Sequence, residues 1–154
     1  MKLAILQLRG LRTAVRTLLV ILGWATCLAA ITLVGIFNGL LLPKGLGGLL
    51  PQVLGGSVWG PWILYVSMLA TSLLAAFLIE NPGIAFGSFF VSFCVAGAIT
   101  YLVLILPGLL GAYNSSGILA EVSIRFTFVA LFPFPLIAGL LGTILGLGLA
   151  ETRA

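Results

Sequence analysis

The sequence contains no histidine and no aspartate, and its only acidic residues are Glu80, Glu121 and Glu151. Bis-histidine haem ligation, histidine-based zinc sites, aspartyl dyads and Ser-His-Asp triads all require side chains that this chain lacks. No carboxylate falls in the middle of a hydrophobic run, which argues against a proton-coupled transporter. We therefore expect a protein that is not an enzyme and that holds no cofactor or metal ion.

Charged residues of both signs are scarce, at 6% of the chain, whereas hydrophobic residues make up 62%. A soluble domain has about 25% charged residues, because it needs them to cover its surface. Lipid is the simple alternative to water for a surface of this composition. A spanning helix needs about 20 apolar residues, so 154 residues have room for three to five spans and short loops, without a soluble catalytic domain.

The hydrophobic runs predict four transmembrane helices in a single domain, 1–154. Their expected limits are about 17–42, 58–79, 84–110 and 122–150. The predicted fold class is therefore all-α, an integral membrane four-helix bundle with a basic amphipathic N-terminal segment. The loop at 43–57 is rich in glycine and proline but unusually apolar, and it either skims the membrane interface or forms a short re-entrant segment.

The basic residues are concentrated in the N-terminal segment 1–16, at Lys2, Arg9, Arg12 and Arg16. On a helical wheel they fall within an arc of about 80°, so this segment could form an interfacial helix on anionic lipid, with Gly10 as a joint. It could also be a plain basic flank that orients the first span. In both cases the charge indicates contact with a membrane surface rather than with nucleic acid.

The positive-inside rule sets the expected orientation. A cytoplasmic N-terminus places the four basic residues of the N-terminal segment and Arg153 inside, and leaves Lys44 and Arg125 outside. We therefore expect a multi-pass protein of the cell membrane with both termini cytoplasmic. Asn114 begins an N-x-S/T pattern in the outside loop 111–121 and is a candidate glycosylation site.

Small residues at a spacing of four occur in every predicted span. They let helix backbones approach closely, and van der Waals packing drives helix association in lipid. These faces either hold one bundle together or bind other subunits. The residues predicted to pack between helices are Gly35 and Gly39, then Ser88, Ser92 and Ala96, and finally Ala138, Gly142 and Gly146.

The fourth span contains the sequence Phe-Pro-Phe-Pro, in which Pro133 and Pro135 each remove a helical hydrogen bond. The prolines predict a kink. Discontinuous helices line the substrate sites of many transporters, although kinks are also common in membrane helices without a transport role.

Two further interpretations concern individual side chains. Glu121 and Arg125, at i and i+4 at the start of the fourth span, suit a helix-capping acid and a surface ion pair. Cys27 and Cys94 both fall inside apolar runs, and we interpret them as small buried hydrophobic side chains rather than a disulfide pair.

These features favour a non-catalytic accessory or structural subunit of a larger membrane protein assembly, with helices packing through small-residue faces. The alternative is a small homo-oligomeric channel or transporter that uses the proline-kinked fourth helix. A membrane enzyme acting on lipid is a third hypothesis, for which three acids and no histidine offer little chemistry. The expected partners are the lipid bilayer and other membrane subunits or further copies of the chain, and not nucleic acid.

Overall fold

The computed structural model describes residues 2–43, 51–52, 60–79, 81–111 and 116–152. Their elements are α1 (Lys2–Phe37), β1 (Leu42–Pro43), β2 (Pro51–Gln52), α2 (Gly60–Ile79), α3 (Pro82–Leu109), α4 (Ser116–Leu131) and α5 (Phe134–Glu151). The helices α1, α2, α3 and α5 are long and apolar enough to cross a membrane. The predicted all-α membrane bundle is confirmed, and the chain is a multi-pass membrane protein.

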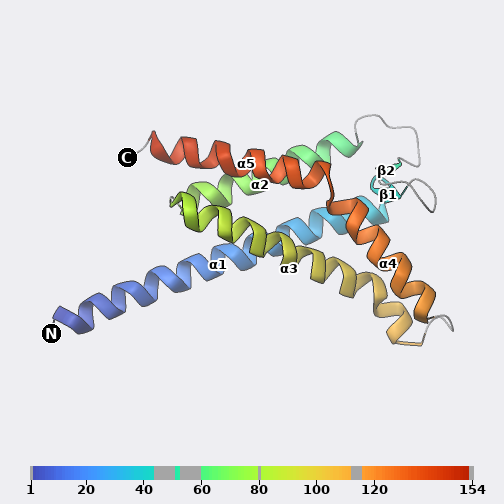
Figure 1. Cartoon of the computed structure of the whole chain (residues 1–154), viewed down its shortest axis with the longest axis horizontal. Helices are drawn as coiled ribbons and strands as arrows, with labels where there is room; N and C mark the ends of the chain where they lie inside the picture. Colours follow the sequence, from blue (N-terminus) through green and yellow to red (C-terminus); the bar gives the residue numbers. More distant parts are fainter. Residues whose placement is uncertain (1, 44–50, 53–59, 80, 112–115, 153–154) are drawn as a thin grey trace.

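Helix α1 is one uninterrupted helix of 36 residues, so the joint expected at Gly10 does not occur. Its spanning part is Ala14–Phe37, and its N-terminal part projects beyond the other helices (Figure 1). Lys2, Arg9 and Arg12 lie on this projecting part of the helix. A helical extension of α1 that carries the basic residues therefore takes the place of the separate interfacial helix that was one of the two expectations.

Helix α1 ends at Phe37, five residues before the predicted limit, because Gly39 turns the chain. Gly39 has φ +70°, a left-handed conformation that only glycine adopts readily. Its N–H donates to the carbonyl of Ile36 at 3.0 Å, and the next N–H, of Leu40, donates to that of Gly35 at 2.8 Å. This pair of bonds is a Schellman motif. The assignment of Gly39 to a packing face was wrong, because it lies outside the helix and terminates it.

Gly35 lies on the inner side of the same turn and is buried. A Cβ atom there would lie 2.5 Å from Leu41 Cδ1 and 2.8 Å from Leu64 Cδ1. The missing side chain thus lets Leu41 fold back onto α1 and lets α2 approach it. Beyond the turn, β1 and β2 pair as a two-residue antiparallel ladder, with Leu42 opposite Gln52.

Helices α2 and α5 form the most extensive helix–helix contact in the described structure, and their backbones approach closely. A Cβ atom at Gly142 would collide with the carbonyl oxygen of Leu69, and one at Gly146 with that of Leu73. Both glycines are buried, whereas Ala138 on the same face is only half-buried. Close approach of two helices in lipid depends on such small residues, so these two glycines determine how α5 lies on α2.

Helix α3 begins at Pro82, two residues before its predicted start, because Asn81 caps it. The Asn81 side chain accepts a hydrogen bond from the N–H of Ile84 at 3.1 Å, and proline suits the first helical position. Farther along, Ser92 Oγ donates to the carbonyl of Ile21 on α1 at 3.1 Å. Ser88 and Ala96 lie on the same buried face as Ser92.

The fourth predicted span is two helices, α4 and α5, and this corrects the expectation of one kinked helix over 122–150. The break lies at Phe132 and Pro133, between Leu131 and Phe134. Pro133 and Pro135 cannot donate backbone hydrogen bonds, and their rings clash with the preceding turn. The chain consequently changes direction (Figure 1), so that α5 lies along α2 while α4 pairs with the second half of α3.

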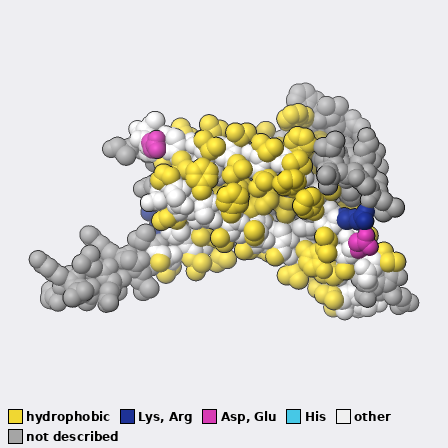
Figure 2. All heavy atoms as spheres, in the orientation of Figure 1, with side chains coloured by type: hydrophobic (Ala, Val, Ile, Leu, Met, Phe, Trp, Pro, Cys, Tyr) yellow, Lys and Arg dark blue, Asp and Glu magenta, His cyan; other side chains and the backbone are white. Residues whose placement is uncertain are grey.

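Both chain termini lie at the same end of the bundle (Figure 1). The charged side chains that the structure describes are Arg16, Glu121, Arg125 and Glu151. On the face shown in Figure 2, charge appears only near the two ends of the molecule, and the middle is apolar. This distribution matches a bilayer whose normal runs along the bundle.

Substituting alanine at Gly142 and, as a matched control, at Gly148 tests the α2–α5 contact. We expect Gly142→Ala to destabilise the protein by about 1–3 kcal/mol, because the new methyl group meets the Leu69 carbonyl. Gly148 has nothing within 4 Å of its Cβ position, so Gly148→Ala should be neutral or stabilise by up to about 1 kcal/mol. Unfolding in detergent measures both changes, and equal stabilities would contradict the close contact.

Candidate functional surfaces

The interior of the bundle is centred on Trp24 of α1, which is 2% exposed. Its indole Nε1 donates to Ser72 Oγ on α2 at 3.2 Å, and its ring lies 5.7 Å from that of Phe89 on α3. Gly139 of α5 completes the group, since a Cβ atom there would lie 2.6 Å from Phe89 Cε2. All four membrane-length helices therefore meet at one point.

Sequence analysis did not single out Trp24 or Gly139. The position of Trp24 within its span could have indicated its role. Trp and Tyr normally lie at the membrane interface, whereas Trp24 lies near the middle of a span, where its N–H needs a partner. Gly139 had no such signal, because it lies one residue away from the Ala138, Gly142 and Gly146 series.

The buried hydroxyl groups mostly bond to their own helix rather than lining a path. Thr32 Oγ1 donates to the carbonyl of Leu28 at 2.8 Å, and Thr143 Oγ1 to that of Gly139 at 2.9 Å. Thr100 bonds to Ala96 in the same way, at 2.8 Å. Each of these hydroxyl groups uses its hydrogen within its own helix, so none of them has an O–H left to donate to a solute.

Arg16 lies at the end of the bundle where the termini are. Its Nη2 donates to the carbonyl of Leu78 at 3.1 Å, near the C-terminus of α2. The last carbonyls of a helix have no intrahelical donor and concentrate negative potential, which a cation stabilises. Arg16 therefore ties α1 to α2 as well as contributing basic charge at the membrane surface.

At the opposite end, Arg125 Nη2 lies 2.8 Å from Glu121 Oε1. The expected i, i+4 pair is present, but the expected capping role of Glu121 is wrong. Because α4 begins at Ser116, Glu121 lies in the second turn and not at the helix N-terminus. Glu80 and Asn114 fall outside the described residues, so the candidate glycosylation site remains a prediction.

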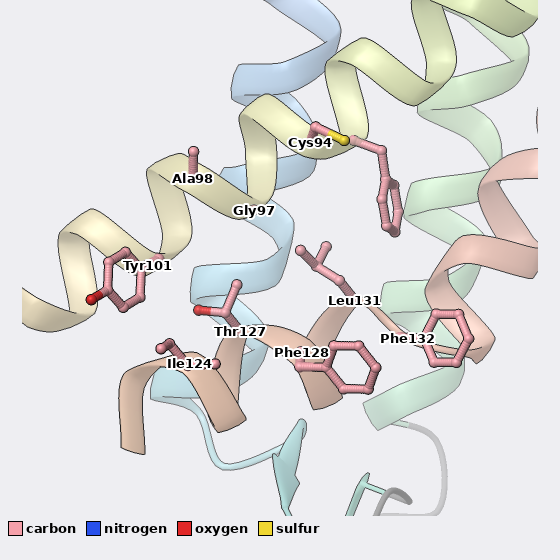
Figure 3. A pocket seen from close by; sticks show the side chains of 10 residues that line it. Cys94, Gly97, Ala98, Tyr101, Ile124, Thr127, Phe128, Leu131 and Phe132 are labelled. Carbon is pink, nitrogen blue, oxygen red and sulfur yellow. The ribbon is translucent and has the colours of Figure 1, made fainter. Parts of the chain in front are cut away.

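The divergence of α4 from α5 leaves an apolar groove between α3 and α4, with a volume of about 460 Å³. Figure 3 shows side chains of the two helices facing each other across it, with Leu131 pointing toward Gly97. The lining residues are Phe93, Cys94, Gly97, Ala98 and Tyr101 of α3, Ile124, Thr127, Phe128 and Leu131 of α4, and Phe132 in the break that follows α4. Pro133 ends the groove by turning the chain toward α2.

Cys27 and Cys94 are both exposed, which corrects the expectation that they are buried. Here "exposed" means not covered by the rest of the chain, and such a surface in a membrane protein faces lipid or a partner. Cys94 lies in the α3–α4 groove, and Cys27 lies on the outer side of α1. An apolar run alone cannot separate the two sides of a membrane helix, because both are hydrophobic.

The outer faces of the helices differ in side-chain size. Those of α2 and α5 expose large residues such as Ile63, Leu74 and Leu141. The outer side of α1 also exposes large residues, such as Leu19, Leu22 and Val34, but four small exposed residues lie among them in mid-span: Gly23, Thr26, Cys27 and Ala30. We call these four residues the α1 outer face. Gly23 has nothing within 4 Å of its Cβ position.

No protein-family model, curated protein or solved structure matches this chain. Its function must therefore be argued from its own surfaces. Among the described side chains, no three potential metal ligands gather, and the α1 outer face and the α3–α4 groove are the features that stand out.

Replacing Ser72 with alanine tests the hydrogen bond at the centre of the bundle. We expect Ser72→Ala to destabilise the protein by about 1 kcal/mol, because the buried Trp24 N–H loses its acceptor. Ser67→Ala is the matched control, since Ser67 Oγ donates only to Ile63 of its own helix, at 2.8 Å. Unfolding in detergent, followed by tryptophan fluorescence, measures both. Indistinguishable variants would show that the bond contributes little.

Proposed function

We propose that the protein is a non-catalytic accessory or structural subunit of a larger membrane protein assembly, which it joins through the α1 outer face. The observation that supports this is the size of the exposed side chains. Ordinary lipid-facing positions favour large apolar residues, and those of α2 and α5 follow that pattern. Small residues in mid-span are instead typical of helix–helix contacts.

The chain's own contacts support the same interpretation. Where small residues face inward, another helix approaches closely, as α2 does at Gly142 and Gly146. The α1 outer face presents small residues too, and none of the described helices lies against it. The Thr26 hydroxyl donates to the carbonyl of Leu22 at 2.8 Å, so its polar group is satisfied and the face presents a close-packing surface.

In the orientation that fits this role, the protein lies in the cell membrane with both termini in the cytoplasm. The two ends of the chain lie at the same end of the bundle (Figure 1), so any orientation puts them on the same side. Arg16 and the basic residues of the α1 extension then favour the cytoplasmic side, following the positive-inside rule. The extension would lie against anionic headgroups or an acidic surface of the assembly.

A homo-oligomeric channel or transporter that uses the helix break has less support. The space beside the break is the α3–α4 groove, and its lining is almost entirely carbon. A solute path needs polar groups to replace water, and the buried hydroxyl groups described above bond to their own helices.

Purification at native abundance tests the proposed subunit role. Wild-type protein in mild detergent should retain one or more membrane partners, identified by mass spectrometry. Gly23→Leu should reduce their recovery at least fivefold, because its side chain blocks close approach, without altering the stability of the isolated chain. Gly148→Leu is the matched control, because Gly148 is also exposed and has nothing within 4 Å of its Cβ position.

A monomer that retains no partner at native expression would overturn the proposal. Equal recovery of partners with Gly23→Leu and with wild type would reject the α1 outer face as the docking surface. Flux through liposomes containing the purified protein, above that of empty liposomes, would favour the channel instead.

A further inference from the structure

The α3–α4 groove exists because neighbouring helices diverge at the proline break. Helices α3 and α4 touch at two levels: a Cβ atom at Gly97 would lie 3.2 Å from Leu131 Cδ1, and one at Gly108 would collide with Leu119. Beyond Leu131, α5 turns away to α2 (Figure 1). No third helix of the described chain then covers the two lining faces.

The position of the groove along α3 places it within the hydrocarbon layer. Helix α3 starts at Pro82, and the lining residues Phe93 and Tyr101 lie about 17 Å and about 29 Å along its axis from there, at 1.5 Å per residue. A hydrocarbon core is about 30 Å thick. The groove therefore occupies the half of the bilayer farther from the termini, and Tyr101 lies near the headgroup boundary, where tyrosine is favoured.

The groove fits an apolar chain better than a helix. Cys94, Gly97 and Ala98 provide a wall of small residues on α3, and opposite them lie the aromatic rings of Phe128 on α4 and of Phe132 just after it (Figure 3). The Thr127 hydroxyl, which also lines the groove, already donates to the carbonyl of Ser123 at 2.8 Å. The lining thus has little with which to recognise a polar ligand.

The volume of the groove helps to distinguish an acyl chain from a transmembrane helix as its occupant. The groove encloses about 460 Å³. At roughly 30 Å³ for a group the size of a water molecule, this space holds about fifteen methylene groups. A helix about 10 Å across fills roughly 900 Å³ over the 12 Å between the levels of Phe93 and Tyr101, so a transmembrane helix could insert only some of its side chains into the groove. One acyl chain fits inside it.

The rim of the groove has the charge that the head of such a molecule needs. Arg125 follows the lining residue Ile124 and precedes the lining residue Phe128 by three positions, so at 100° per residue it lies about 60° around α4 from Phe128, beside the lining face. Its side chain is 44% exposed in its pair with Glu121. A guanidinium group has five N–H donors in a planar fork and binds phosphate oxygens well.

We propose that the α3–α4 groove is a binding site for one phospholipid, which lays an acyl chain along Cys94, Gly97 and Ala98 and places its phosphate beside Arg125. Tail and head are recognised by different parts of the site. The apolar lining selects the chain, and the arginine at the outer rim selects the phosphate. The site is separate from the α1 outer face, so it does not depend on the proposed subunit role.

Counting bound lipid by native mass spectrometry tests this site. The full-length protein is delipidated in detergent and titrated with palmitoyl-oleoyl phosphatidylglycerol. We expect one phospholipid to bind at least tenfold more tightly than any further molecules. Ala98→Trp should weaken this first binding at least tenfold by filling the groove. Ala70→Trp is the matched control, because Ala70 is exposed on α2, and it should leave the first binding unchanged.

Substitutions at Arg125 and Glu121 test the role of the charged rim in binding the phosphate. Arg125→Gln should weaken the first binding about fivefold or more, because the phosphate loses its cationic partner. Glu121→Gln keeps the arginine and removes the competing carboxylate, so binding should stay equal or become tighter. Equal affinity in Arg125→Gln and wild type would overturn the assignment of the headgroup.

The two cysteines allow a measurement that places no bulky group in the groove. Alkylation of Cys94 by N-ethylmaleimide is compared with that of Cys27 in the delipidated protein, with and without phosphatidylglycerol. The lipid should slow alkylation of Cys94 several-fold, because its acyl chain covers the thiol, and leave that of Cys27 unchanged. Equal protection of both cysteines, or equal lipid binding by Ala98→Trp and Ala70→Trp, would overturn the proposal, as would occupancy of the groove by a second copy of the chain.

Discussion

Pro133 and Pro135 have no backbone N–H to donate, so the hydrophobic run 122–150 cannot continue through them as a regular α-helix. The rest of the arrangement depends on this constraint. Once the chain turns at Pro133, α5 is able to lie along α2 while α4 stays beside α3 (Figure 1). The same turn thus produces both the close backbone contact at Gly142 and Gly146 and the open groove between α3 and α4.

Helices in lipid gain little from burying apolar surface against one another, so packing geometry determines which faces meet. In this protein the inner contacts combine small residues with a few hydrogen bonds between helices. Trp24 bonds to Ser72, Ser92 to the Ile21 carbonyl, and Arg16 to the Leu78 carbonyl. These three bonds join α1 to α2 and α3, whereas α5 is held on α2 by the fit of its glycines. The two proposals extend the same principle outward, since one surface suits a helix and the other suits a lipid chain.

Much of the architecture could be predicted from the residues. Long apolar runs indicated membrane helices, the prolines indicated a disruption in the fourth, and Ser88, Ser92 and Ala96 were recognised as one face of α3. The errors share a cause. Gly39 continues the spacing of a packing face, yet its positive φ ends the helix, and spacing alone does not report φ. Cys27 and Cys94 lie in apolar runs, but a run gives no indication of which side of a membrane helix turns inward.

The sequence by itself determined the class of the protein, since helices are the only way for apolar segments of this length to satisfy their backbone groups in lipid. It also located the disruption of the fourth segment at Pro133 and Pro135, which lack the N–H that a regular helix uses, although it predicted a kink there and not two separate helices. Only the tertiary structure decided the direction taken after the break, and with it the partners of α4 and α5. It alone placed the α1 outer face and the groove outside the packed interior. The physical reason is that the choice among several apolar faces depends on the fit of side chains from distant segments, such as Gly142 against the Leu69 carbonyl.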